Sequence, residues 1–368
     1  MKGQTLIIVV ISFWKSKEIL EAAMDTKIIK IDTADPDLSV LSEAANFIKA
    51  GELVAFPTET VYGLGANALE AKAVEKIFRA KGRPQDNPLI VHVSSIEMAR
   101  GLISQDLDRY SNIVELLWPG PVTLIFRKNE LISQAVTAGL QSVGIRLPAN
   151  PVALKLIELS GVPIAAPSAN LSGKPSPTSE EHVLSDMEGK IACIILSGDV
   201  LFGLESTIVD LSGSKPALLR PGPVDVERIK ELLPELVVPP FVEAREEYAG
   251  LALSPGLKYR HYSPDVPLVL IEGNSGEVVS RAGILARRSK SILLCSEEYS
   301  EFYPVHIKKV VLGSRNDLYR VASNLFRALR NEENRNYSQI IAESFPENGI
   351  GLAIMNRLRK AASRIERV

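Results

Sequence analysis

The sequence predicts an α/β protein with two domains: a larger domain with a twisted mixed sheet, and a smaller Rossmann-like parallel domain. Its 368 residues exceed what one hydrophobic core usually serves. Short apolar runs typical of strands alternate with stretches of helical periodicity along most of the chain. A region rich in charge, Gly and Pro interrupts this alternation between residues 241 and 265.

The first domain is expected over residues 24–236. Its strands are predicted at KIIKI, LVAF, PLIVHV, VTLIF, VGIRLP, PIAAPS, ACIILSG, STIVDL and ALLRPG. Its helices are predicted over residues 38–50, 68–80, 108–117, 151–160 and 226–233. Gly51 ends the first of these helices, and PTETVYGLG after LVAF is expected to be a loop.

A lid-like linker is expected over residues 237–265, followed by a C-terminal domain over residues 266–368. Unstructured connections of about 25 residues are usually functional lids or binding loops. Beyond the linker, PLVLIEG, SILLCS, KKVVLG and QIIAES predict four strands, separated by helical stretches such as 318–331 and 350–364. This alternation is typical of a parallel sheet.

The N-terminal 23 residues are interpreted as an extension outside the fold, with Met24 as the true start. The apolar run from Leu6 to Trp14 is too short to span a bilayer, and no convincing cleavage site follows it. We therefore expect no membrane association.

Composition excludes several classes of function. Lys and Arg number 42 against 44 Asp and Glu, so the net charge of -2 makes no case for an extended nucleic-acid or membrane surface. Cys193 and Cys295 each lie in an apolar run, which suggests neither a disulfide nor a metal cluster and fits a reducing cytoplasm. No histidine has a Cys or His neighbour at metal-ligand spacing.

Two nucleotide-binding motifs do not fit the sequence. The stretch from Gly63 to Ala68 matches G-x-G-x-x-G/A loosely, but Pro57 to Tyr62 separate it from the preceding strand. No acidic residue ends a second strand at the required distance. The chain also contains no G-x-x-x-x-G-K-[ST] loop, so any ATP must be held by other means.

A basic turn is the first candidate anion site. Gly82 and Pro84 constrain the backbone around Lys81 and Arg83, which favours a fixed grip on a polyphosphate. Asn87 before Pro88 is more typical of a turn. The preceding cations, Lys76 and Arg79, are equally well explained as complements to the helix dipole.

Further polar residues lie in or after predicted strands. Ser168 and Asn170 follow IAAP, where either a nucleotide or a simple turn explains them. Arg146 lies inside VGIRLP and needs an anion, which is either an internal carboxylate or that of a substrate. Arg220 at the end of ALLR repeats this argument, and His92 alone is more typical of the core.

Taken together, the motifs resemble the YrdC/Sua5 family in order and spacing. They are FPTETVYGLG, KIFRAKGRP, NPLIVHV, WPGPVT, TAGL, VGIRLP, IAAPSAN, FGLESTIVD and LLRPGP. The resemblance covers residues 27–236, and SPGLKYRHYSP with the distal domain is similar to the longer Sua5 architecture.

The resemblance implies synthesis of L-threonylcarbamoyl-AMP, pyrophosphate and water from L-threonine, bicarbonate and ATP, with Mg²⁺ carried by the ATP. A tRNA threonylcarbamoyl transferase would then pass the group to adenosine beside the anticodon. The alternative is a double-stranded RNA-binding module without turnover, because the basic turn could make a weak RNA contact. A different adenylylating enzyme, acting on another amino acid, is a further alternative.

The resemblance also implies roles for individual residues. The expected ATP site comprises Lys81, Arg83, Asn87, Ser142, Ser168, Asn170, Ser176, Arg220, Tyr259 and His261, with Lys81 and Arg83 catalytic. The expected threonine site comprises Thr60, His92, Arg146 and Ser206, with Arg146 taking the carboxylate. Tyr259 and His261 belong to the lid.

Overall fold

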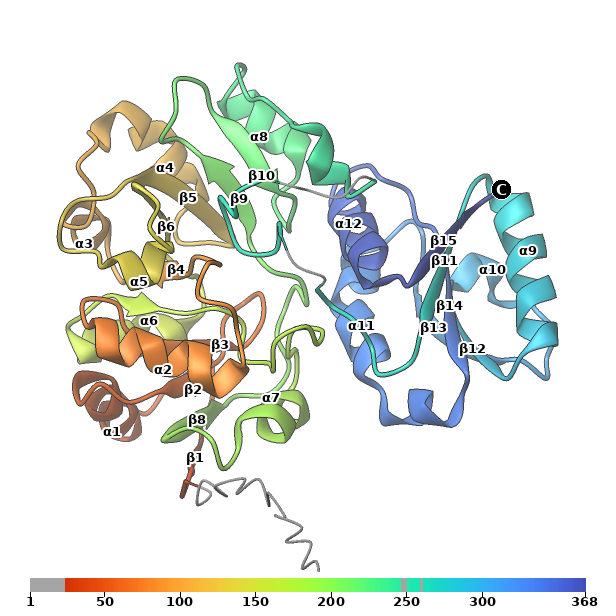
Figure 1. The fold of residues 1–368 in the computed structure, drawn as a ribbon, viewed down its shortest axis with the longest axis horizontal. Coiled ribbons are helices and arrows are strands. Elements are labelled where there is room, and N and C mark those ends of the chain that lie inside the picture. Colours follow the sequence, from red (N-terminus) through yellow and green to blue (C-terminus); the bar gives the residue numbers. More distant parts are fainter. Residues whose placement is uncertain (1–23, 246–249, 259–260) are drawn as a thin grey trace, which may run out of the picture.

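The computed structural model describes residues 24–245, 250–258 and 261–368. It contains two sheets with their helices, and the two α/β units lie side by side (Figure 1). The proposed extension over residues 1–23 and the predicted lid residue Tyr259 lie outside the described residues. No helix in the described ranges is both long and apolar enough to cross a membrane.

The larger unit is built on a ten-stranded mixed sheet, which confirms the predicted fold class. The strand order is β1-β8-β2-β3-β7-β4-β6-β5-β9-β10. The strands are β1 (Lys27–Lys30), β2 (Val54–Phe56), β3 (Gly63–Asn67), β4 (Ile90–His92), β5 (Val122–Arg127), β6 (Ser142–Arg146), β7 (Ile164–Ala165), β8 (Cys193–Leu196), β9 (Thr207–Asp210) and β10 (Ala217–Arg220). Strands β4 and β6 pair in parallel, whereas β5 and β6 are antiparallel.

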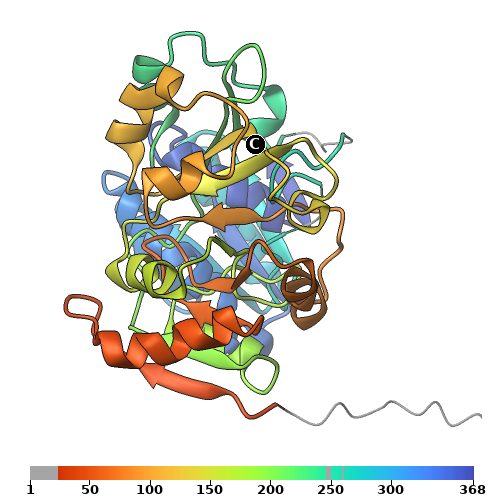
Figure 2. The same ribbon diagram turned by 90° about the vertical axis from the view of Figure 1, so that its left-hand side faces the viewer.

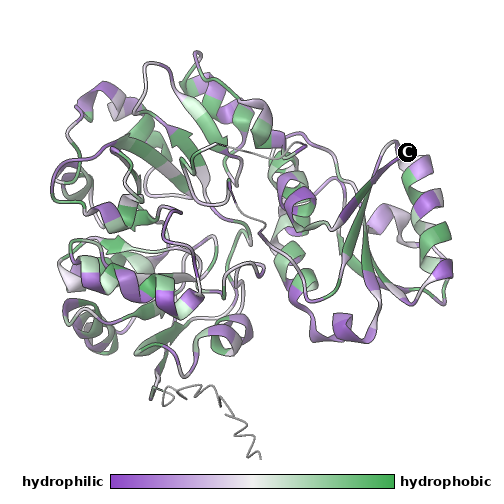
Figure 3. Ribbon diagram, viewed as in Figure 1, coloured by the Kyte–Doolittle hydropathy of each residue, from purple (hydrophilic) through white to green (hydrophobic). Residues whose placement is uncertain are grey.

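Helices cover this sheet in two separate hydrophobic clusters. One cluster contains α1 (Leu38–Lys49) and α6 (Pro151–Ser160). The other contains α2 (Ala71–Lys81), α4 (Ser111–Leu117), α7 (Glu180–Met187) and α8 (Val226–Leu232). Apolar residues concentrate in the strands and polar residues on the outer helices (Figure 3). Shorter helices are α3 (Ile96–Arg100) and α5 (Gln134–Thr137).

Strand β3 corrects the prediction that PTETVYGLG is entirely loop. Its glycines pack closely, because a Cβ on Gly65 would lie 2.7 Å from the Cγ2 atom of Ile164 and 2.9 Å from the Cε1 atom of Phe56. Only glycine fits there without displacing its neighbours. The rejected dinucleotide motif therefore lies in an antiparallel strand paired with β2, not in a phosphate-binding turn.

The smaller unit is a five-stranded parallel sheet with the order β13-β12-β14-β11-β15. Its strands are β11 (Leu268–Glu272), β12 (Ser291–Ser296), β13 (Lys308–Gly313), β14 (Gln339–Glu343) and β15 (Arg364–Arg367). Strand β15 was not predicted, and the helix expected to reach Arg364 ends at Ala361. The helices are α9 (Ser275–Arg288), α10 (Glu297–Ser300), α11 (Leu318–Arg330) and α12 (Gly351–Ala361).

Helices α11 and α12 lie on the side of the smaller sheet that faces the larger unit (Figure 1). Seen from the larger unit, the blue smaller unit lies directly behind the first sheet (Figure 2). Leu204 of the larger unit and Tyr262 of the linker belong to the same hydrophobic cluster as α11 and α12. The two units therefore share a packed interface.

Candidate active site

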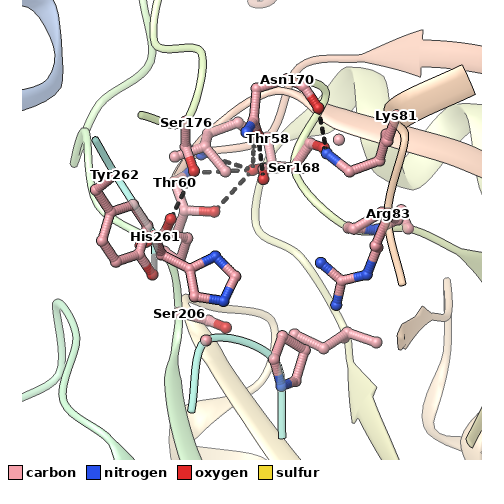
Figure 4. A pocket seen from close by; sticks show the side chains of 18 of the residues that line it. Thr58, Thr60, Lys81, Arg83, Ser168, Asn170, Ser176, Ser206, His261 and Tyr262 are labelled. Atoms are coloured by element: carbon pink, nitrogen blue, oxygen red, sulfur yellow. Dashed lines mark hydrogen bonds between the residues drawn. The ribbon is translucent and has the colours of Figure 1, made fainter. Parts of the chain in front are cut away.

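Most of the residues singled out from the sequence line one cavity of the larger unit (Figure 4). Those that line it are Thr60, Lys81, Arg83, His92, Arg146, Ser168, Asn170, Ser176, Ser206, Arg220 and His261. They come from strand ends, from the turn after α2 and from the linker. The fold therefore brings positions more than 150 residues apart in sequence onto one surface.

Three predicted residues are placed differently. Asn87 is buried and does not line the cavity, but its backbone oxygen accepts a hydrogen bond from Arg83 at 3.3 Å. Ser142 lines an adjacent, more apolar cavity, which shares Ile90 and Pro255 with the first. Tyr259 lies outside the described residues.

Helix α2 delivers the basic turn to the cavity. The helix ends at Gly82, whose left-handed φ of 61° turns the chain after Lys81. The Lys81 ammonium is buried and donates to the backbone oxygens of Ser168, at 2.5 Å, and Asn170. Burial, and then the nearby Arg83, lower the pKa of Lys81 well below its ordinary value. A bound polyphosphate would favour the charged ammonium.

The loop after β7 forms the cavity wall beside Lys81. The Ser168 hydroxyl lies 2.5 Å from the Oδ1 atom of Asn170. The Asn170 amide donates to the backbone oxygens of Leu171 at 2.8 Å and Lys174 at 2.9 Å. These side chains therefore order the turn and also line the cavity, so the two sequence-based interpretations of this motif are compatible.

Arg146 and His92 lie beside each other because β4 and β6 pair in register. The Arg146 guanidinium forms a 2.7 Å ion pair with Glu59 and donates to the Thr60 hydroxyl at 2.8 Å. The sequence predicted that Arg146 needs an anion, either an internal carboxylate or that of a substrate. The structure provides an internal carboxylate, that of Glu59. Burial, and then Arg146, lower the pKa of His92 to about 3, so this imidazole is neutral at physiological pH.

A second buried ionic group lies at the ends of β9 and β10. Arg220 donates to the backbone oxygen and the hydroxyl of Ser206, both at 3.0 Å. The neighbouring Glu205 accepts from the Ser176 hydroxyl at 2.6 Å and pairs with Arg357 of α12 at 3.0 Å. Burial alone would raise the pKa of Glu205, but Arg357 and Arg220 outweigh it and lower that pKa to about 2.

The linker closes one side of the cavity through Pro255, Gly256, His261 and Tyr262. The Tyr262 ring stacks on Phe326 of α11 with centroids 5.1 Å apart. Burial lowers the pKa of His261 to about 3, so it also presents a neutral ring. The linker therefore supplies cavity wall while its tyrosine is anchored in the smaller unit.

Among the residues of this site, sequence reasoning did not identify Glu59, Glu205 and Tyr262. The acidic residues lie in loops, where a carboxylate is ordinary, and only the need of Arg146 for an anion pointed to one of them. Tyr262 is adjacent to the predicted His261. Within the described ranges, no group of three or more His, Cys, Asp or Glu side chains could hold a metal ion.

Two family models match the chain in series. The Sua5/YciO/YrdC model, described as "Telomere recombination", matches residues 46–222. A model described as the C-terminal domain of threonylcarbamoyl-AMP synthase matches residues 224–363.

Full-length relatives and a solved structure match the same region. The threonylcarbamoyl-AMP synthase of Pyrococcus abyssi is 45% identical over 324 residues, covering 87% of this chain and 93% of the relative. That of Bacillus subtilis is 44% identical, covering 90% of this chain and 95% of the relative. The crystal structure of P. abyssi Sua5 complexed with L-threonine superposes with a TM-score of 0.87 at 43% identity, covering 93% of this chain and all of that one.

Proposed function

The chain belongs to the Sua5 family, and on this premise we propose that it is an L-threonylcarbamoyladenylate synthase. It would convert L-threonine, bicarbonate and ATP into L-threonylcarbamoyl-AMP, pyrophosphate and water. The observation that carries the proposal is the convergence of Lys81, Arg83, Arg146 and Arg220 on one cavity that hydroxyl and amide side chains also line. Such a set fits a triphosphate with an amino acid beside it.

The cavity divides into two ends in this proposal. Lys81 and Arg83 face the triphosphate, together with Ser168 and Asn170, while Arg146 serves the amino acid. Thr60, His92 and Ser206 lie around the amino acid, and the two hydroxyl residues select its side chain. The neutral ring of His92 suits a place beside the amine, because a charged imidazolium would repel an ammonium group. Ser142 and Asn87 do not line this cavity. We propose that they support the nucleotide end, Ser142 from the adjacent cavity and Asn87 through its contact with Arg83.

The chemistry needs no nucleophile from the protein. The threonine amine attacks the bicarbonate carbon, water leaves, and a carbamate forms. A carbamate oxygen then attacks the α-phosphorus of ATP, and the bond to the bridging oxygen of pyrophosphate breaks. Fixed cations beside the departing pyrophosphate stabilise the charge that develops there, and the linker excludes water from the reacting atoms. Lys81 and Arg83 are the cations proposed for this task.

We propose that Mg²⁺ enters with ATP, where it would neutralise phosphate charge. Two carboxylates at the cavity are already engaged, Glu59 by Arg146 and Glu205 by Arg357 and Ser176, whereas the lining also carries several cations and hydroxyl groups. That lining suits a metal-bound triphosphate. We further propose a cytoplasmic enzyme that hands its product transiently to a tRNA threonylcarbamoyl transferase, with at most a weak RNA contact.

The direct test incubates the purified protein with labelled threonine, bicarbonate and Mg-ATP and separates the adenylate product. We expect product and pyrophosphate in equal amounts, and neither when threonine or bicarbonate is omitted. Arg83→Met should reduce the rate at least about 100-fold, as for loss of a group that stabilises transition-state charge. Arg228→Met is the matched control, because Arg228 pairs with Glu231 on the surface of α8.

Two results would refute the proposal. Pyrophosphate release stimulated by serine or by carbamoyl phosphate, and not by threonine with bicarbonate, would indicate a different adenylylating enzyme. Salt-sensitive binding of double-stranded RNA without ATP turnover would indicate a binding module.

A further inference from the structure

Two arginines of the smaller domain enter the larger domain on either side of Ser176. Arg330 is the last residue of α11, and Arg357 lies in the middle of α12. The Arg330 guanidinium donates to the backbone oxygen of Pro175 at 2.7 Å. Arg357 pairs with Glu205, whose other carboxylate oxygen accepts the Ser176 hydroxyl bond.

Arg357 is fully buried in this interface. Besides its 3.0 Å contact with Glu205, it donates to the backbone oxygen of Pro221 at 2.8 Å, and its guanidinium lies 5.7 Å from the centre of the Tyr262 ring. The Nε atom of Arg357 therefore holds one carboxylate oxygen of Glu205, while the Pro221 contact fixes the guanidinium, and together they orient the carboxylate. Because each Glu205 oxygen has its own partner, this orientation also fixes the direction of the Ser176 hydroxyl.

Arg330 holds the same loop from its other side. It pairs at 2.9 Å with Asp186, a fully buried residue of α7. Asp186 also pairs with Lys174 at 3.0 Å and accepts from the Leu171 amide at 3.3 Å. The loop from Leu171 to Ser176, which lines the cavity, is thus tied to α11 through Arg330 and to α12 through Arg357.

We propose that the smaller domain is a positioning element for the nucleotide end of the cavity, and that Arg330 and Arg357 are its positioning residues. This inference rests on the proposed function, which assigns Ser176 to the ATP side. Domain docking alone would not require these groups, because well-packed apolar residues usually stabilise an interface as much as buried ion pairs or more. What the ion pairs add is a fixed direction for the groups they bind.

The test measures ATP and threonine affinity by calorimetry in Arg357→Met and Arg330→Met. We expect each to raise the ATP Kd about tenfold or more, while the threonine Kd stays within about twofold. Arg357→Lys should recover little, because a lysine lacks the fork. Arg327→Met is the matched control: Arg327 is on α11 and pairs across the same interface with Asp199, but both side chains are about half exposed.

Arg357→Met leaves the Glu205 carboxylate buried without its ion-pair partner, which disfavours folding. The double variant Arg357→Met with Glu205→Gln removes both charges of the pair and therefore serves as the control for misfolding. We expect that variant to fold and still bind ATP weakly. A cycle with Ser176→Ala then tests the route, since Arg357→Met should have little further effect on ATP once the hydroxyl is absent.

Additive effects in this cycle, ATP affinity equal to that of Arg327→Met, or equal losses for both ligands would overturn the positioning role. Because the cycle measures ATP binding, it distinguishes these outcomes even if the wild-type protein makes no adenylate. A wild-type protein that makes no adenylate would refute the proposed function and not the positioning role.

Discussion

Each nitrogen of the Arg146 guanidinium has a partner within the protein. A substrate carboxylate must therefore share this guanidinium with those partners. Its Nε atom donates to Gly120 at 3.3 Å, its Nη1 atom to Thr60, and its Nη2 atom pairs with Glu59. A substrate carboxylate would therefore join an arginine that is already oriented. Preorganisation of this kind lowers the entropic cost of binding.

We predict that Arg146→Lys raises the threonine KM about tenfold or more and changes the ATP KM by less than about twofold. Lysine keeps a positive charge beside Glu59 but cannot serve Thr60, Gly120 and a carboxylate together. Steady-state kinetics with each substrate varied in turn gives the comparison. Arg127→Lys, at the exposed end of β5, is the control. Equal rises in both KM values would contradict the assignment.

The lowered pKa of Lys81 predicts an unusual pH dependence of ATP binding. The ammonium that should grip the phosphates is lost as the pH rises through its lowered pKa, so ATP affinity should fall with increasing pH below the range of an ordinary lysine. The fall is at most about tenfold per pH unit for one protonation site. Calorimetry between pH 6 and 9 measures it.

Lys81→Arg is the informative companion, because arginine stays charged throughout this range. Its ATP affinity should vary less with pH than that of the wild type. Lys360, whose pKa burial lowers to about 7, is present in both proteins and therefore cancels in the comparison. Identical pH profiles would show that Lys81 does not titrate in this range.

The cationic site residues could be found from the sequence, and their partners could not. A charged residue within an apolar strand, as at Arg146 or Arg220, is costly to bury without an anion beside it, so it predicts an anion site. Glu59 and Glu205 present no such conflict in their loops, because their burial results from tertiary packing. The order of the strands is likewise set by long-range pairing, so sequence alone indicated the anion sites but not the buried networks.

At the level of elements, apolar runs identified most strands, and the two exceptions have clear reasons. Strand β3 is GLGAN, in which two glycines hide the usual alternation and serve close packing. Strand β15 is RIER, an edge strand dominated by charge. A helix end was predicted within a few residues where a terminating residue was visible, as at Gly51 after α1.

Helix α12 also contacts the linker that closes the cavity. Asn356 donates to the backbone oxygen of Val242 at 2.8 Å, Arg359 to that of Glu243 at 2.8 Å, and Lys360 to that of Gly256 at 2.7 Å. One helix of the smaller domain therefore holds the linker both where it begins and where it reaches the cavity. The sequence showed the linker but not this attachment.

We predict that Lys360→Met loosens the linker at Gly256. Loss of one hydrogen bond of about 1 kcal/mol should increase amide exchange across residues 250–258 about fivefold. The effect should be larger at pH 6 than at pH 8, because the charged ammonium that predominates below its pKa of about 7 donates the stronger bond. Lys308→Met, an exposed partner of Glu333, is the control. Unchanged exchange would exclude a holding role for Lys360.

At the scale of the molecule, residues 202–206 connect domain docking to the cavity within five positions. Phe202 lies beside Tyr319 of α11 with ring centroids 6.3 Å apart, and Leu204 is in the smaller domain's hydrophobic cluster. Glu205 then pairs with Arg357, and Ser206 lines the cavity beside Arg220. A change in docking must therefore move the backbone that carries the cavity wall.

Gly203 lies close to the main chain of α11, and we predict that Gly203→Ala separates the two domains. Its φ is 72°, and a Cβ there would lie 2.6 Å from the Cα atom of Ser323 and 2.8 Å from its backbone oxygen. Both the strained backbone and the contact with the main chain of α11 oppose a methyl group. We expect a loss of about 1–3 kcal/mol in stability, a larger radius in X-ray scattering and weaker ATP binding.

Gly283→Ala provides the matched comparison, because Gly283 lies in α9 and an added Cβ would meet no atom within 4 Å. Alanine should stabilise that helix by up to about 1 kcal/mol. Thermal unfolding of both variants separates a general effect of alanine from a specific one at the interface. If Gly203→Ala had the melting temperature and the ATP affinity of the wild type, the interface would have accommodated the methyl group without effect. Tight domain docking would then not determine the shape of the cavity.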